Sequence, residues 1–181
     1  MLEGEQNLIR GAQSGEGSCF EALYDHYVPP IYRFIYMKVS GKEEAEDLTH
    51  EVFLSAWQNL KRYRPRGFPF SSWLYQIARN KVIDHYRLKK PALPIEEVDV
   101  EFAAAGKNLD DVIDTEIHFK KVRRALRSLT PDQQDVILMK FMEELSHREI
   151  AAALMKSEGA VRIIQYRALS ELKKILADEP I

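Results

Sequence analysis

Residues 145–162 read LSHREIAAALMKSEGAVR, and this stretch decides how the C-terminal part of the chain is interpreted. Ser146 and Glu149 have the spacing of a capping box, and Ser157 can cap a second helix after a short turn. Two short helices joined by a tight turn form a helix-turn-helix, whose second helix enters the DNA major groove. Proteins that never contact DNA also contain such helix pairs, so a second feature is needed.

The second helix of this motif has two different sides. The apolar side, expected to face a helical bundle, contains Val161, Ile164, Ala168, Leu169 and Leu172. Gln165 falls within that side, so we expect it to be hydrogen-bonded internally. The other side contains Gly159, Arg162, Ile163, Tyr166 and Ser170. We expect Arg162 and Arg167 to contact phosphates or bases, whereas Ile163 either meets a thymine methyl group or packs on the preceding helix.

The second feature is a cationic and aromatic segment between residues 61 and 90. It contains nine Lys or Arg and a single acid, Asp84. Aromatic residues are interleaved with these cations: Tyr63, Phe68, Phe70, Trp73, Tyr75 and Tyr86. Because phosphates require positive charge and unpaired bases stack on flat rings, this composition is typical of a single-stranded nucleic-acid site.

Charge is strongly segregated in this chain of 181 residues, whose net charge is only −2. Residues 1–60 carry a net −6, residues 61–90 a net +8, residues 91–116 a net −7 and residues 117–181 a net +3. Positive charge confined to two places indicates a protein that meets DNA locally and another partner elsewhere.

Composition excludes several protein classes. The apolar fraction of 45% is typical of a globular protein, and no apolar run approaches the roughly 20 residues of a membrane span. The acids Glu3 and Glu5 and the lack of an apolar segment near them argue against a signal peptide. The single cysteine, Cys19, excludes a disulfide framework and fits a reducing cytoplasm, so we expect a cytoplasmic protein.

The periodicity predicts an all-α fold of two small helical domains, residues 15–90 and 113–177, joined by a flexible acidic linker over residues 91–112. Pro29-Pro30 suggests a bend, and Ser40 with Glu43 suggests a capping box. Thr130-Pro131 with Gln133 is a further helix start. A helix beginning at about Phe70 should carry a polar side of Gln76, Arg79, Asn80, Ile83 and Arg87, which either binds nucleic acid or is merely solvated.

Three motifs, in order, resemble the extracytoplasmic-function (group IV) sigma factors of bacterial RNA polymerase, within the sigma-70 family. They are EDLTHEVFLSAW at 46–57, FSSWLYQIARN at 70–80, and LTP at 129–131 followed by the helix-turn-helix and YRAL at 166–169. The resemblance implies a sigma region 2 domain, a sigma region 4 domain, and promoter-specific transcription initiation without catalytic residues, metal or cofactor.

The resemblance also implies site residues. Core polymerase, through its β′ clamp helices, would be bound by Asp47, Glu51, Phe53 and Trp57, unless the two aromatic residues are core and only the acids dock. The −10 DNA would be bound by Arg62, Tyr63, Arg64, Arg66, Phe68, Gln76, Arg79, Asn80, Ile83 and Arg87. The −35 DNA would be bound by Arg148, Ser157, Glu158, Ala160, Arg162, Ile163, Tyr166 and Arg167. The resemblance also implies that the linker threads through channels of the polymerase and that the β flap binds the second domain. An anti-sigma factor is a further possible partner of proteins in this family.

The chain departs from the family pattern at a few positions. Met155 stands in the turn where glycine is common, so the turn must close without the residue best suited to positive φ. His50 stands where glutamine is frequent, and the run from Ile163 to Gln165 is less basic than usual, which leaves −35 recognition by Arg162 open.

Two rival interpretations remain at this stage. A dimeric helix-turn-helix regulator would act without polymerase, but it does not account for the +8 segment. A metalloenzyme could use Asp47 and His50, yet di-iron bundles need two Glu-x-x-His pairs with inward Glu partners.

Overall fold

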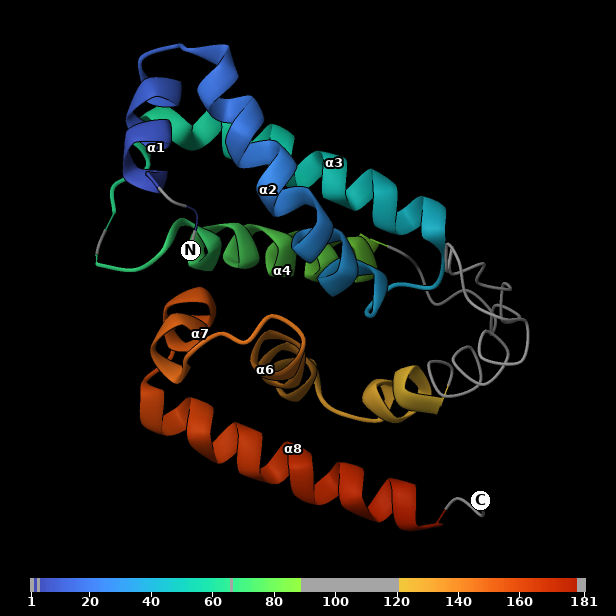
Figure 1. Ribbon diagram of the computed structural model, residues 1–181. Coiled ribbons are helices and arrows are strands. Elements are labelled where there is room, and N and C mark those ends of the chain that lie inside the picture. The colour runs from blue at the N-terminus through green and yellow to red at the C-terminus, as the bar shows by residue number, and fades with distance from the viewer. Residues whose placement is uncertain (1, 3, 66, 89–120, 179–181) are drawn as a thin grey trace, which may run out of the picture.

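A computed structural model describes residues 2, 4–65, 67–88 and 121–178. Within these ranges the chain forms helices and loops and no strand, which confirms the predicted all-α class. The N-terminal unit comprises α1 (Glu5–Gln13), α2 (Gly17–Tyr36), α3 (Lys42–Asn59), the 3₁₀ turn η1 (Leu60–Arg62) and α4 (Phe70–Leu88). In the C-terminal unit, residues 121–127 are helical and are followed by α6 (Pro131–Phe141), α7 (His147–Leu154) and α8 (Glu158–Asp178) (Figure 1). The predicted linker lies outside the described residues.

The helix starts follow largely from local sequence. The Thr130–Gln133 and Ser146–Glu149 capping boxes are both present, as predicted. The Ser40–Glu43 box is wrong, because α3 begins at Lys42 and Glu44 therefore occupies the third helical position. The carboxylate of Glu44 accepts a hydrogen bond of 3.0 Å from the Ser40 backbone N–H.

The N-terminal unit is built around α2, α3 and α4. Fully buried side chains from these helices, including Leu23, Ile31, Phe34, Val52 and Leu74, form its core. The two prolines lie inside α2, which continues unbroken from Gly17 to Tyr36. The helix α1 packs on α2 and η1 and was not predicted, although the buried Ile9 and Ala12 have helical spacing.

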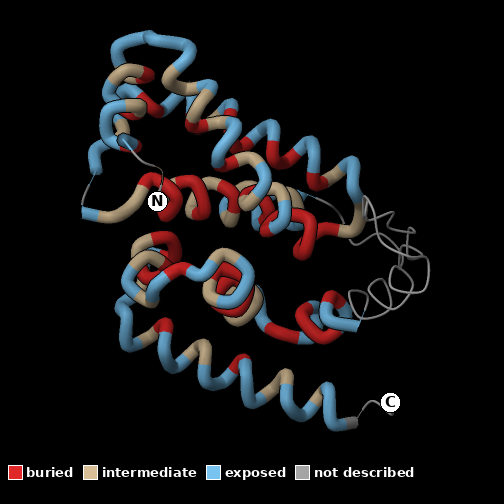
Figure 2. The backbone as a smooth tube through the Cα atoms, viewed as in Figure 1, coloured by how far each residue is buried: buried red, intermediate tan, exposed pale blue. Residues whose placement is uncertain are grey.

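The two units dock through α4, which contacts α7 (Figure 1). Buried residues gather on α4, α6 and α7 at the centre of the molecule, whereas α8 is exposed along much of its length (Figure 2). Among the described residues, no helix has the length and apolarity required to cross a membrane.

Candidate nucleic-acid interface

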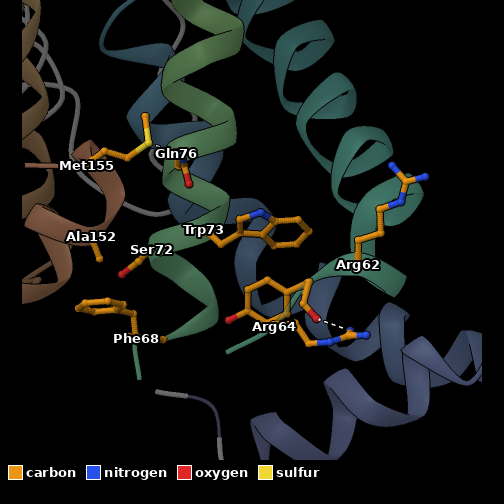
Figure 3. Close-up of a pocket in the computed structure, with 10 residues that line it drawn as sticks. Arg62, Arg64, Phe68, Ser72, Trp73, Gln76, Ala152 and Met155 are labelled. Carbon is orange, nitrogen blue, oxygen red and sulfur yellow. Dashed lines mark hydrogen bonds between the residues drawn. The ribbon is translucent and has the colours of Figure 1, made fainter. Parts of the chain in front are cut away.

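A pocket of about 400 Å³ lies where the loop between η1 and α4 approaches the C-terminal unit (Figure 3). Its lining from the N-terminal unit is Arg62, Tyr63, Arg64, Phe68, Pro69, Ser72, Trp73 and Gln76, and Ala152 and Met155 line it from the C-terminal unit. Five of these residues were predicted to bind −10 DNA, and the structure brings them together. Ser72 and Met155 were not predicted as site residues, and Trp73 was predicted only as one of the aromatic residues of the cationic segment. Arg66 lies outside the described residues.

Aromatic rings form one wall of this pocket. The ring centroid of Tyr63 lies 4.7 Å from that of Trp73 and 5.3 Å from that of Phe70. A tyrosine hydroxyl is uncharged at neutral pH, and burial and the nearby Glu5 carboxylate raise the pKa of Tyr63 further. The wall therefore presents neutral, flat side chains beside the cationic loop, which suits base stacking.

The predicted polar side of α4 divides into two parts. Arg79 is half-buried and forms ion pairs of 2.8 Å with Asp132 and 2.9 Å with Asp135, both from α6. Burial opposes its charge, but the hydrogen bonds and charges of these aspartates raise the Arg79 pKa overall. Gln76 Nε2 contacts Met155 Sδ at 3.2 Å. The remaining predicted residues on this side, Asn80, Ile83 and Arg87, are exposed.

Other contacts from the C-terminal unit cover the same face. The Ser72 hydroxyl donates to the Glu149 carbonyl oxygen at 3.2 Å, and the Arg148 guanidinium lies 5.5 Å from the Phe68 ring centroid. Asp135 is fully buried and also pairs with Lys38. Local sequence offered no sign of these pairings, since the partners lie far apart along the chain.

The helix-turn-helix follows its prediction closely. Met155 has φ 53° and ψ 44°, so the turn closes in the left-handed region without glycine. His147 Nε2 and Gln165 Oε1 are 2.5 Å apart, which confirms that the Gln165 side chain has a hydrogen-bond partner within the protein. Ser157 Oγ accepts from the Ala160 backbone N–H at 3.2 Å. The prediction that Leu169 faces the bundle is wrong: the residue is 42% exposed, because it lies at the edge of the side of α8 on which Val161 and Ala168 are buried.

The outward side of α8 is open. Ile163 is 54% exposed and Tyr166 is 76% exposed, so Ile163 does not pack on the preceding helix. Arg162 and Glu158 form an exposed ion pair of 3.6 Å, and Arg167 is also exposed. Two cations and two apolar side chains therefore share this open surface.

Comparison with known families agrees with this geometry. The family "Sigma-70 region 2" matches residues 23–91, and the family "Sigma-70, region 4" matches residues 119–172. The ECF RNA polymerase sigma factor SigW of Bacillus subtilis is 30% identical over 179 residues, covering 94% of this chain and 95% of SigW. This chain belongs to the ECF RNA polymerase sigma factors. Its function is that of the family: it binds core RNA polymerase and directs promoter-specific initiation.

Further relatives extend this comparison. The sigma factor BldN of Streptomyces coelicolor is 36% identical over 173 residues, which cover 95% of this chain and 66% of BldN. The solved structure of CnrH in complex with the cytosolic domain of CnrY shares the fold, with a TM-score of 0.76, 23% identity, and coverage of 97% of this chain and 99% of that chain. RpoE of Bartonella quintana, solved with the anti-sigma factor NepR, has a TM-score of 0.70 at 22% identity, covering 89% of this chain and 98% of that chain.

In this sigma factor the four residues predicted to bind core polymerase have different environments. Asp47 and Glu51 are exposed on α3, and Glu51 pairs with Lys81 at 2.9 Å. Phe53 is 3% exposed and contacts the Tyr24 ring at 4.9 Å, so it is a core residue. Trp57 is 44% exposed and packs edge-on against another ring, which leaves part of its surface available.

No group of three or more His, Cys, Asp or Glu side chains that could hold a metal ion occurs within the described ranges. The Asp47 and His50 side chains of the enzyme alternative are both exposed on α3. A di-iron bundle would instead require ligands that point into its core.

Proposed function

We propose that residues 15–90 bind core polymerase and hold −10 DNA, and that residues 113–177 read −35 DNA. The two family matches, at residues 23–91 and 119–172, support this division. The boundaries at 91 and 112 rest on composition, since residues 89–120 lie outside the described ranges.

The observation that carries the −10 assignment is the pocket in Figure 3. Arg62 and Arg64 supply positive charge, while Tyr63, Phe68 and Trp73 supply rings. Unstacking a base costs a few kcal/mol, so a surface that binds only the unpaired strand shifts the duplex toward the open form. We assign the exposed Asn80, Ile83 and Arg87 to the same DNA.

Binding of DNA by Arg79 requires the two units to separate. Its guanidinium is paired with Asp132 and Asp135, and a phosphate can replace these carboxylates only if α6 moves away. The same movement uncovers Ser72 and Gln76. We propose that the structure is a closed form and that promoter-bound polymerase holds an open one.

The −35 assignment rests on the open side of α8. Arg162 and Arg167 contact phosphates or bases in this proposal, and Ile163 and Tyr166 contact the groove. The helix start, with Ser157, Glu158 and Ala160, lies against the DNA backbone, and Arg148 from α7 joins this surface once the units separate.

Binding of core polymerase is assigned to α3. Asp47 and Glu51 are the exposed acids that would meet the β′ clamp helices, with the exposed part of Trp57 beside them. The β flap would bind the C-terminal unit. Because CnrH was solved with CnrY and RpoE with the anti-sigma factor NepR, we also propose an anti-sigma factor as a partner.

We further propose that the chain has no catalytic activity and acts in the cytoplasm, where RNA polymerase and the chromosome are found. The family consists of DNA-recognition proteins that work through polymerase. No metal or cofactor is assigned.

Reconstitution tests this function. Core polymerase with this chain should initiate at a subset of promoters that core alone ignores, and sequencing of transcript starts identifies them. Arg162→Ala should weaken dependence on the −35 element. A protein that instead binds a palindrome as a dimer, without polymerase, would support the regulator interpretation and refute ours.

A further inference from the structure

The helix α1 holds both ends of the loop that carries the −10 pocket. At the first end, Gln13 Nε2 donates to the carbonyl oxygens of Leu60 and Tyr63, both at 2.9 Å. At the other end, Glu5 Oε2 accepts from the Phe70 backbone N–H at 3.4 Å. One helix therefore fixes the points at which this loop leaves and rejoins the helical core.

Glu5 takes the place of a helix cap that the local sequence lacks. Phe70 begins α4, where backbone N–H groups have no partner inside the helix. The two preceding residues, Phe68 and Pro69, have no side-chain oxygen that could accept this hydrogen bond. A carboxylate at this end of a helix also interacts favourably with the helix dipole. The start of α4 thus depends on a residue 65 positions upstream.

The position of Glu5 is itself strictly determined. The residue is 7% exposed, and its Oε1 accepts a hydrogen bond from the Tyr27 hydroxyl. A tyrosine hydroxyl is protonated and can donate at neutral pH, and burial and this hydrogen bond raise the Tyr27 pKa further. The Tyr27 ring lies 5.7 Å from the buried Phe70 ring, which in turn contacts Tyr63 and Trp73 in the aromatic wall of the pocket. A buried carboxylate is costly unless it is hydrogen-bonded, so both contacts must be kept.

We propose that Glu5 and Gln13 are positioning residues for promoter opening: through α1 they hold the loop in the conformation that receives an unpaired −10 base. Neither side chain lines the pocket, so both act through the loop. This inference rests on the proposed −10 function.

The test measures promoter opening by reconstituted holoenzyme. The variants are Glu5→Ala and Gln13→Ala, and the matched control is Asn7→Ala on the exposed side of the same helix. Among the described residues, Asn7 Oδ1 accepts a hydrogen bond from Arg10 alone. Permanganate reactivity of unpaired thymines reports opening on a promoter found by transcript mapping. We expect opening to slow about tenfold in both variants, because Glu5→Ala loses a charge-assisted hydrogen bond to the loop and Gln13→Ala loses two neutral ones. Core binding should stay within about twofold of the control.

Conservative variants separate positioning from general stability. Glu5→Gln keeps an acceptor for the Phe70 N–H and can donate to the Tyr27 oxygen, so it should restore most of the opening. Gln13→Glu places a carboxylate against two carbonyl oxygens, so opening should fall below that of Gln13→Ala. A promoter already unpaired over the −10 region should still bind the variants weakly, because base capture is impaired.

The inference is overturned if Glu5→Ala and Gln13→Ala open promoters at the wild-type rate. It is also overturned if opening and core binding fall in parallel, since that is the signature of partial unfolding. If Glu5→Ala does not fold, Gln13→Ala decides the matter alone, because Gln13 is only part-buried and its loss leaves no buried tyrosine hydroxyl without an acceptor. A wild-type chain that initiates at no promoter refutes the proposed function instead.

Discussion

Replacing Asp135 with asparagine should release the C-terminal unit from the N-terminal one. Asp135, on α6, is fully buried and pairs with Lys38, whose side chain is 5% exposed, and with Arg79 Nε at 2.9 Å. Asparagine has nearly the same shape but carries no charge. In the variant, the Lys38 ammonium group would therefore stay buried without a counter-charge.

Removing one partner of a buried ion pair costs about 3–5 kcal/mol. Arg79 keeps its contact with Asp132 at 2.8 Å, but among the described residues Lys38 has no other carboxylate partner. Lys38 regains water if the units separate, and neither helical core has to unfold for this. At about 1.4 kcal/mol per factor of ten, the equilibrium between docked and separated units should shift roughly 10²- to 10⁴-fold.

Energy transfer between two dyes measures this separation. Cys19 is the only cysteine, so dyes can be placed at Gln58→Cys and Lys173→Cys, both exposed positions, in a Cys19→Ala background. Transfer should fall in Asp135→Asn.

Asp84→Asn is the control for this measurement, because it removes an exposed ion pair of 3.2 Å within the N-terminal unit that is worth at most about 1 kcal/mol. If Asp135→Asn shows wild-type transfer and an unchanged urea midpoint, the buried ion pairs do not hold the units together.

Three further outcomes follow from local contacts. Ser146→Ala removes the acceptor for the Glu149 N–H and should lower the free energy of unfolding by about 1 kcal/mol in urea denaturation; an unchanged midpoint would show that the cap is dispensable. Gly11→Ala places a Cβ 2.5 Å from Cys19 Sγ and should lower the free energy of unfolding by about 1–3 kcal/mol. The loss should be smaller in a Cys19→Ala background, where the sulfur is absent, and equal losses in both backgrounds would contradict this explanation. Burial raises the pKa of Glu143, although the neighbouring Arg33 acts in the opposite direction. The folded state therefore binds the Glu143 proton more tightly than the unfolded state does. The stability that this proton contributes is lost as pH rises through the raised pKa. Glu143→Gln should remove the loss of stability that the wild type shows between the ordinary glutamate pKa and the raised one, and a wild-type pH profile in this variant would refute the assignment.

Several features could be predicted from the sequence because they depend on residues within a few positions of one another. The Ser146–Glu149 box, the turn at Met155 and the internal position of Gln165 all follow from helical periodicity and capping chemistry. The error at Ser40 was a shift in where α3 begins, and boundaries of this kind are the least certain part of local patterns.

Only the tertiary structure decided which partners the charged and polar side chains take. Arg79 was predicted as a DNA-binding cation, and no local pattern reveals that carboxylates 53 and 56 residues away neutralise it in the closed form. Nor could spacing alone separate the buried Phe53 from the half-exposed Trp57. A periodic pattern determines which side of a helix is apolar, whereas the docking of distant helices determines what covers each side, and that depends on contacts between residues far apart along the chain.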